Sequence, residues 1–319
     1  MPHVTTQEKL QQLEKLNFDN DDDIASLQAF LKLKNNLIAA KAAKCCAEHQ
    51  LFNFCPELLS AFQYFVEKPE KDKGCFAKSA IVKALYELDY NNSDFYGQAI
   101  TVRQPEPVWG GTVDTAVDVR CWAAYGLTLS PNTRIILQLV ELLHDPEPQA
   151  RLGAVKAIAN TNPTHAEILL REKVLDGDVD GYIIGECFHQ LIAIEPDHSL
   201  EFIQPYLYHD DEEWVEYAAL AIAESHDSAA FTLLRDSIEQ SFYDAKKHHL
   251  IKAMALHRSN HAIDFLLAQL TVVGRQEVES IIEALSIHRS NDGIRQRIKD
   301  AVNRLKQATA INAFNQFWN

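Results

Sequence analysis

The chain has 319 residues, 47% of them hydrophobic and 24% charged, and its 45 acidic and 30 basic side chains give a net charge of −15. No run of about 18 apolar residues is present, which excludes a membrane-spanning helix, and the first residues lack the apolar core of a secretory signal. The six cysteines form no CxxC motif, so we expect reduced thiols, no disulfide scaffold and a cytoplasmic location.

The negative charge is concentrated in the middle of the chain. Residues 131–240 hold 6 basic and 21 acidic side chains, whereas residues 241–319 hold 11 basic and 7 acidic ones. Such a field repels nucleic acid and anionic membranes and attracts basic proteins. We therefore expect a basic protein partner, with no binding of nucleic acid or membrane.

A helix–turn–helix unit repeats along the chain. An Asp, an Asn or, once, an Arg marks the predicted start of each second helix, and Lys or Arg follows six residues later in the first four units. Those four pairs are Asn35–Lys41, Asp72–Lys78, Asp114–Arg120 and Asp145–Arg151. The later starts are Asp178, Asp210, Asp244 and Arg275. Intervals of 31 to 42 residues between starts are typical of stacked helical repeats.

Each unit is amphipathic and cannot bury its apolar face alone. Stacking neighbouring units buries a continuous core, so we predict an all-α fold, an α-solenoid of about eight helical pairs that extends as one array over residues 1–319. No long stretch alternates with a period of two, so no sheet is expected. The helices Thr6–Leu16 and Asn291–Gln307 are predicted to cap the two ends.

The repeat resembles the HEAT-repeat superfamily, in particular its short bacterial form, the PBS-lyase HEAT-like repeat. The resemblance covers roughly residues 22–290 and is carried by Asp145-Pro146-Glu147-Pro148, Ala150-Arg151, Ala154 and Ala157-Ile158. It implies a ladder in which the Asp and Arg side chains join neighbouring units. The resemblance extends to deoxyhypusine hydroxylase, an enzyme with a similar helical scaffold in which His-Glu pairs bind iron. No His-Glu dipeptide occurs here, so that activity is not expected.

Residues 90–112 interrupt the repeat. The interval from Asp72 to Asp114 is about ten residues too long, and two prolines and a Gly-Gly pair predict a non-helical insert in the third unit, whose first helix is shortened or replaced. The insert is rich in aromatic residues, which either bind a partner or pack the loop onto the solenoid. We predict Trp109 as its structural anchor, with an exposed rim of Phe95, Tyr96 and Arg103.

Two acidic segments have both a functional and a structural interpretation. The run Asp210, Asp211, Glu212 and Glu213 forms a candidate surface for a basic partner, although acidic residues also stabilise helix starts. The carboxylates Asp176, Asp178 and Asp180 resemble the first half of a calcium loop. Its twelfth position is Cys187, where calcium requires a bidentate Glu, so we expect a turn and helix start.

No catalytic or cofactor motif is present, including GxSxG, a P-loop or GxGxxG. We therefore predict a non-catalytic protein-interaction scaffold without cofactor or metal. The alternative is an enzyme or enzyme subunit that acts on a small ligand, such as a bilin-lyase-like protein. A closed pocket lined by Trp109, Trp122 and Tyr125 would favour that alternative, and an open surface would favour the scaffold.

Overall fold

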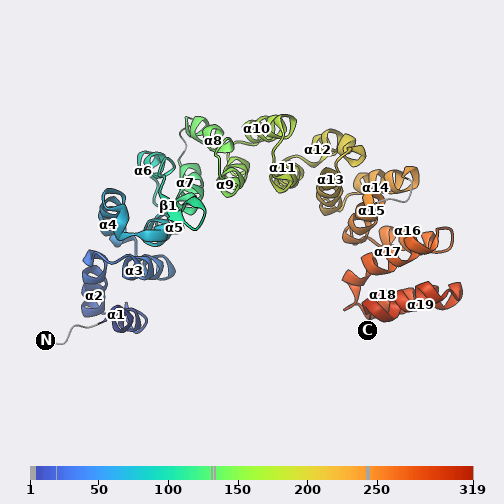
Figure 1. Cartoon of the computed structure of the whole chain (residues 1–319), viewed down its shortest axis with the longest axis horizontal. Coiled ribbons are helices and arrows are strands. Elements are labelled where there is room, and N and C mark those ends of the chain that lie inside the picture. The colour runs from blue at the N-terminus through green and yellow to red at the C-terminus, as the bar shows by residue number, and fades with distance from the viewer. Residues whose placement is uncertain (1–4, 19, 131, 133, 242–244, 319) are drawn as a thin grey trace. The chain divides into compact units, whose positions relative to one another are not determined.

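The computed structural model describes residues 5–18, 20–130, 132, 134–241 and 245–318. Over these ranges the chain forms nineteen α-helices and one two-stranded hairpin, and helical pairs follow one another along the sequence (Figure 1). The chain is an all-α solenoid, as the repeat predicted. It divides into two compact units, residues 1–166 and residues 167–319, with the border inside α10 (Pro163–Asp176).

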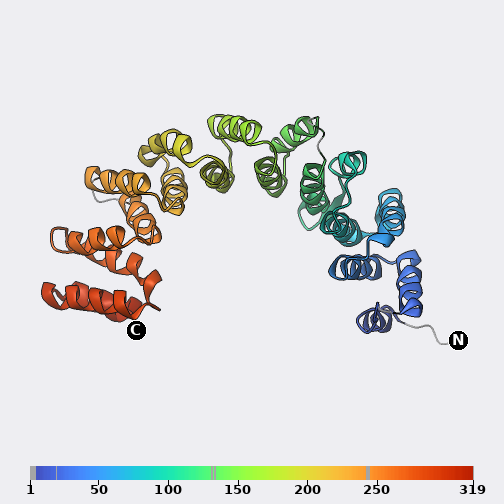
Figure 2. The same ribbon diagram turned by 180° about the vertical axis from the view of Figure 1, so that it is seen from behind.

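In the first unit, alternate helices form two rows. The odd-numbered helices pack against one another in sequence, and the even-numbered helices cover them on one side, as both views show (Figures 1 and 2). The odd row holds α1 (Thr6–Leu13), α3 (Asn36–Glu48), α5 (Phe76–Glu87), α7 (Val117–Thr128) and α9 (Pro148–Ala159). The even row holds α2 (Asp21–Lys32), α4 (Cys55–Glu67), α6 (Ser93–Ala99) and α8 (Ile135–Leu143).

The second unit repeats this arrangement. Its odd row holds α11 (Gly181–Ile194), α13 (Glu212–Glu224), α15 (Ala245–Leu256), α17 (Arg275–Leu285) and α19 (Ala308–Trp318). Its even row holds α12 (Pro196–Ile203), α14 (Ser228–Gln240), α16 (Asn260–Gln269) and α18 (Asp292–Leu305). The predicted second helices of the eight pairs correspond to the odd-numbered helices α3 to α17. The start predicted at Asp244 lies outside the described residues.

In the first two repeats the marker residues cap the second helices with their side chains. Asn35 Oδ1 accepts a hydrogen bond from Ile38 N of α3 at 3.1 Å. Asp72 accepts two, from Ala77 N at 2.9 Å and Lys78 N at 3.0 Å, and its Oδ2 also lies 3.0 Å from Lys78 Nζ in a buried ion pair. Each cap pairs backbone N–H groups that have no partner within the helix. In these two repeats the marker residue both fixes the register and begins the helix, whereas α11 and α13 are capped by Asp180 and Asp211.

The C-terminal cap was predicted wrongly. The helix that begins at Asp292 ends at Leu305, and Lys306 adopts a left-handed conformation with φ 52°. A further helix, α19, then packs on α17 and α18, and Trp318 Nε1 donates a buried hydrogen bond to Ile282 O at 3.0 Å. The buried Trp318 holds α19 against α17.

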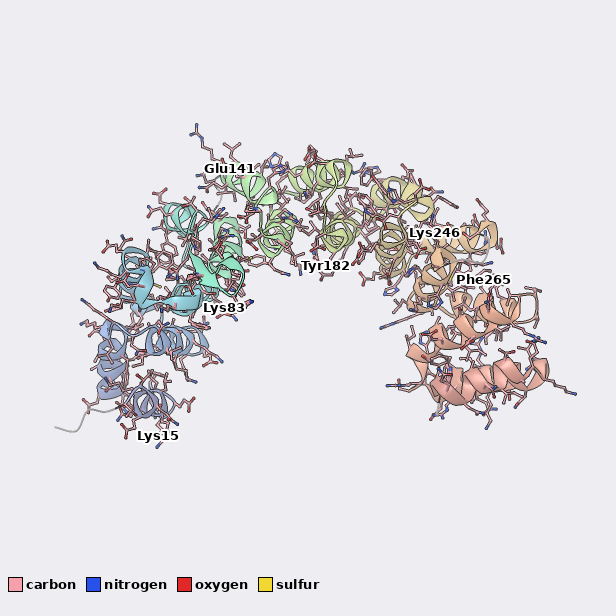
Figure 3. The ribbon with its side chains drawn as sticks, viewed as in Figure 1. Lys15, Lys83, Glu141, Tyr182, Lys246 and Phe265 are labelled. Carbon is pink, nitrogen blue, oxygen red and sulfur yellow. The ribbon has the colours of Figure 1, made fainter. Side chains whose placement is uncertain are left out.

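None of the helices in the described ranges combines the length and apolar character that a membrane span requires. Charged side chains also project from both rows of the first unit. Figure 3 labels Lys83 on α5 of the odd row and Glu141 on α8 of the even row, and both are exposed.

Candidate functional site

Residues 90–112 contain regular structure, so the prediction that this insert is non-helical throughout was wrong, whereas a shortened first helix is present as α6. Asn92 Oδ1 accepts a hydrogen bond from Phe95 N at 3.0 Å and caps α6, a first helix of only seven residues. An antiparallel hairpin follows, formed by β1 (Pro105–Val108) and β2 (Gly111–Asp114), and this corrects the prediction that no sheet is present. The hairpin at residues 105–114 accounts for the additional length of the interval, and Gly110 turns it with φ 90°.

The aromatic residues of α6 are structural. The Tyr96 side chain is fully buried, which corrects its placement on an exposed rim, and its hydroxyl has no hydrogen-bond partner in the described part of the chain. Burial raises the pKa of Tyr96 well above its ordinary value. Phe95 is half-buried, with its ring 5.1 Å from those of Phe62 and Tyr96. These rings fix α6 to its neighbours.

Trp109 is not an anchor. It lies at the hairpin tip with a relative exposure of 105%, and Val108 and Val113 beside it are 50% and 48% exposed. A closed pocket lined by Trp109, Trp122 and Tyr125 is therefore absent. Trp122 and Tyr125 instead pack with Tyr86, at centroid distances of 5.9 and 5.8 Å from its ring. The tip therefore presents three apolar side chains to solvent.

Polar groups at the base of the hairpin hold it in place. Gln104 Nε2 donates to Asp72 O at 2.8 Å and to Glu106 Oε1 at 2.6 Å, and the same Glu106 oxygen accepts from Gly74 N at 2.8 Å. These hydrogen bonds, that from Gln104 above all, hold the pKa of Glu106 below its ordinary value. Asp114 Oδ1 accepts from Gln104 N at 2.9 Å and closes the base. Gln104 and Glu106 were not singled out from the sequence.

A buried charge network lies behind the hairpin. Arg120 has no exposed surface. Its Nη1 lies 2.6 Å from Asp114 Oδ2 of the same helical repeat, and its Nε lies 3.0 Å from Asp145 Oδ2 of the next repeat. Arg103 Nη2 reaches the same Asp145 oxygen at 2.7 Å, so the predicted rim residue is 45% exposed yet already paired. Arg151 donates to Asp145 O at 2.8 Å. The ladder between neighbouring units is confirmed for Asp114, Arg120 and Asp145.

The acidic run at the start of α13 is exposed along its whole length, at Asp210, Asp211, Glu212 and Glu213. One member has a structural role, because Asp211 Oδ1 accepts from Glu213 N at 2.9 Å and caps the helix. The equivalent acidic positions of earlier repeats do not extend this surface, because Asp145 and Asp178 are buried in ion pairs.

The calcium-like segment is a helix start. Asp178 Oδ2 lies 2.9 Å from Lys173 Nζ, with both side chains almost fully buried, and Asp178 Oδ1 accepts from Asp180 N. Asp180 in turn caps α11 by accepting from Tyr182 N at 3.1 Å. Lys173 therefore supplies the positive charge beside Asp178. Among the described residues, which include Asp176, no group of three His, Cys, Asp or Glu side chains is arranged to hold a metal ion.

Comparison with known proteins finds no matching family model and no matching curated protein. Among solved structures, the chain is similar to human deoxyhypusine hydroxylase in complex with glycerol at 13% identity and TM-score 0.31, covering 91% of this chain and 93% of that one. An engineered protein matches at 14% identity and TM-score 0.34, over 98% and 97% of the two chains.

A third similar structure is that of the Pds5–Scc1 complex, at 13% identity and TM-score 0.29, which covers 98% of this chain and 74% of that one. These neighbours include HEAT-like helical-repeat proteins.

Proposed function

We propose that this chain is a non-catalytic, cytoplasmic protein-interaction scaffold of the HEAT-repeat type, which needs no cofactor. The observation that carries the proposal is the fully exposed Trp109 on a hairpin whose base is fixed by Gln104, Glu106 and Asp114. A tryptophan buries a large apolar area at low cost in side-chain entropy, and tryptophans dominate the binding energy of protein interfaces. A fixed hairpin loses little further freedom when its tip is bound.

The acidic run from Asp210 to Glu213 supports a basic partner. Its four side chains are exposed, and it lies in the part of the chain that carries the excess of 21 acidic over 6 basic residues. Charges in such a surface accelerate the encounter with an oppositely charged protein and are screened by salt. The run therefore supplies long-range attraction, and the hairpin tip supplies apolar contact.

Reversing the acidic run tests the proposed basic partner. We expect Asp210→Lys, Glu212→Lys and Glu213→Lys, combined with Asp211→Asn, to slow partner association by about tenfold or more at low salt, with little change in dissociation. Asn retains the helix cap that Asp211 provides. Association rates measured by surface plasmon resonance over a salt series, with a partner recovered from native lysate, provide the readout.

A matched control separates the local surface from net charge. Asp197, Glu201, Glu239 and Glu279 are other exposed acids of the same unit, and changing three of them to Lys and one to Asn alters the net charge equally. This control should slow association much less. Equal slowing in both variants would show that only net charge matters and would remove the acidic run from the proposal.

A further inference from the structure

The hairpin of β1 and β2 has one edge that is blocked against further strands (Figure 1). Pro105 and Pro107 stand at alternate positions of β1, and a proline has no backbone N–H. The donors that β1 supplies to the ladder are therefore the N–H groups of Glu106 and Val108, and the backbone of each proline points away from β2. Because the outer edge of β1 offers no N–H donor, it cannot pair regularly with another strand.

The outer edge of β2 is open. The register places Thr112 opposite Pro107, and the hydrogen bonds of the ladder recur at every second residue, so that Thr115 N donates to Gln104 O at 3.0 Å. Thr112 lies between two bonded positions, and its N–H and C=O therefore point away from β1. No other described residue hydrogen-bonds either group, and Thr112 is exposed. One main-chain donor and one acceptor are thus free to bind an added strand.

The residues around this edge are uncharged. The segment from Pro107 to Val113 has no charged side chain, in a chain whose net charge is −15. A net negative charge opposes the approach of a second copy, but this edge adds no local repulsion. Space is also open here, since a Cβ placed at Gly111 would meet no atom within 4 Å, and Val113 is exposed. Two identical edges can therefore meet without like charges or a steric block.

This self-complementary edge fits a second copy of the chain. We propose that two copies pair through the outer edges of β2, antiparallel and related by a two-fold axis at Thr112. Thr112 N–H of each copy donates to Thr112 C=O of the other, and the two hairpins join into one four-stranded sheet. Val113 of one copy then lies opposite Gly111 of the other, and the two threonine side chains form a favourable cross-strand pair. The pairing goes beyond the proposed binding of a basic partner and does not depend on it.

The assembly closes at two copies. After pairing, the edges that remain are those of β1, which Pro105 and Pro107 block. A two-fold contact uses the same surface of both copies and leaves none for a third. Strands of four residues bury less than the roughly 1,200 Å² of a stable interface. We therefore expect a weak dimer, with a Kd on the order of 100 μM.

Sedimentation velocity of the full chain tests the pairing. From about 5 μM to about 500 μM, a range that brackets a weak dimer, the wild type should shift from monomer to dimer and form nothing larger. Thr112→Pro removes the outward N–H of β2 without taking a hydrogen bond from the hairpin, and it should stay monomeric. Thr112→Val keeps the N–H and a β-branched side chain, so its Kd should stay within about twofold of the wild-type value. Unchanged melting temperatures confirm that both variants fold.

Cysteine cross-linking tests the register. A reciprocal pair at the two-fold axis places the two Cα atoms about 5.5 Å apart, a distance that a disulfide spans. With oxidised glutathione present, Thr112→Cys should form a covalent dimer at least about tenfold faster than Thr101→Cys, because pairing raises the local thiol concentration. Thr101 is exposed in the same unit. Cys121, which is partly exposed, is present in both variants and contributes equally.

Several results would overturn the inference. A wild type that stays monomeric throughout excludes the dimer, and a Thr112→Pro variant that dimerises like the wild type shows that a different surface associates. Equal cross-linking of Thr112→Cys and Thr101→Cys excludes the pairing at Thr112. If the wild type is monomeric while Trp109→Ala loses proteins that the wild type retains from lysate, this inference fails and the proposed function stands.

Discussion

Replacing Arg120 with alanine is expected to lower the free energy of unfolding by about 3–5 kcal/mol, the cost of removing one partner from a buried ion pair. Its guanidinium, which has no exposed surface, lies 2.6 Å from Asp114 Oδ2 and 3.0 Å from Asp145 Oδ2 and donates to Val102 O at 3.0 Å. Without it, Asp145 keeps the partly exposed Arg103 as a cationic partner. Urea unfolding followed by circular dichroism measures the change.

Exposed Arg134 in the same unit is the control, and Arg134→Ala should change stability by less than about 0.5 kcal/mol. If Arg120→Ala lowered the free energy of unfolding no more than Arg134→Ala does, the ladder would not stabilise the first compact unit.

The pH dependence of the free energy of unfolding reports on the same network. Burial raises the pKa of Asp114, but hydrogen bonds from Gln104 N, Ala116 N and Arg120 outweigh it and leave the pKa below its ordinary value. Because the folded pKa is depressed, this carboxylate stabilises the fold above the unfolded pKa of about 3.9, and the contribution disappears as pH falls through the folded value.

Changing Gly126 to alanine is expected to cost about 1–3 kcal/mol or more, the range for overpacking a filled core. A Cβ at this position would lie 2.1 Å from Tyr96 Cε1 and 2.4 Å from Cζ. The Tyr96 ring is fully buried and cannot move aside without displacing α6. Thermal unfolding of the variant measures the effect.

Two further variants identify the collision as the cause. Gly111, in the exposed hairpin, has no atom within 4 Å of a built Cβ, so Gly111→Ala should be close to neutral. Tyr96→Leu should reduce the additional cost of Gly126→Ala, because the ring that blocks the methyl group is gone. Additive effects of the two changes would show that Gly126 and Tyr96 do not interact.

The helical units could be predicted from sequence because their signals are local. An Asp or Asn that caps a helix and a cation six residues later lie within one turn and helix start, as Asp72 and Lys78 show. The partner of Arg120 in the next unit follows from the same repeat. Such patterns need no knowledge of distant contacts, and this explains why the fold class and helix register were obtained.

Burial depends on distant contacts and was predicted less well. Composition alone cannot distinguish Tyr96, which is buried against Gly126, from Trp109, which extends into solvent, because both are aromatic residues in one interrupted segment. Likewise, Asp178 and Asp210 occupy equivalent repeat positions, but a lysine at 173 buries the first.

The most direct test of the scaffold account is a paired measurement on Trp109→Ala. Melting temperature and protein binding are compared with those of the wild type, where binding means retention of proteins from native lysate. The account predicts an unchanged melting temperature and a loss of binding, because Trp109 makes no stabilising contact in the free protein. A large fall in melting temperature with binding unaffected would contradict it.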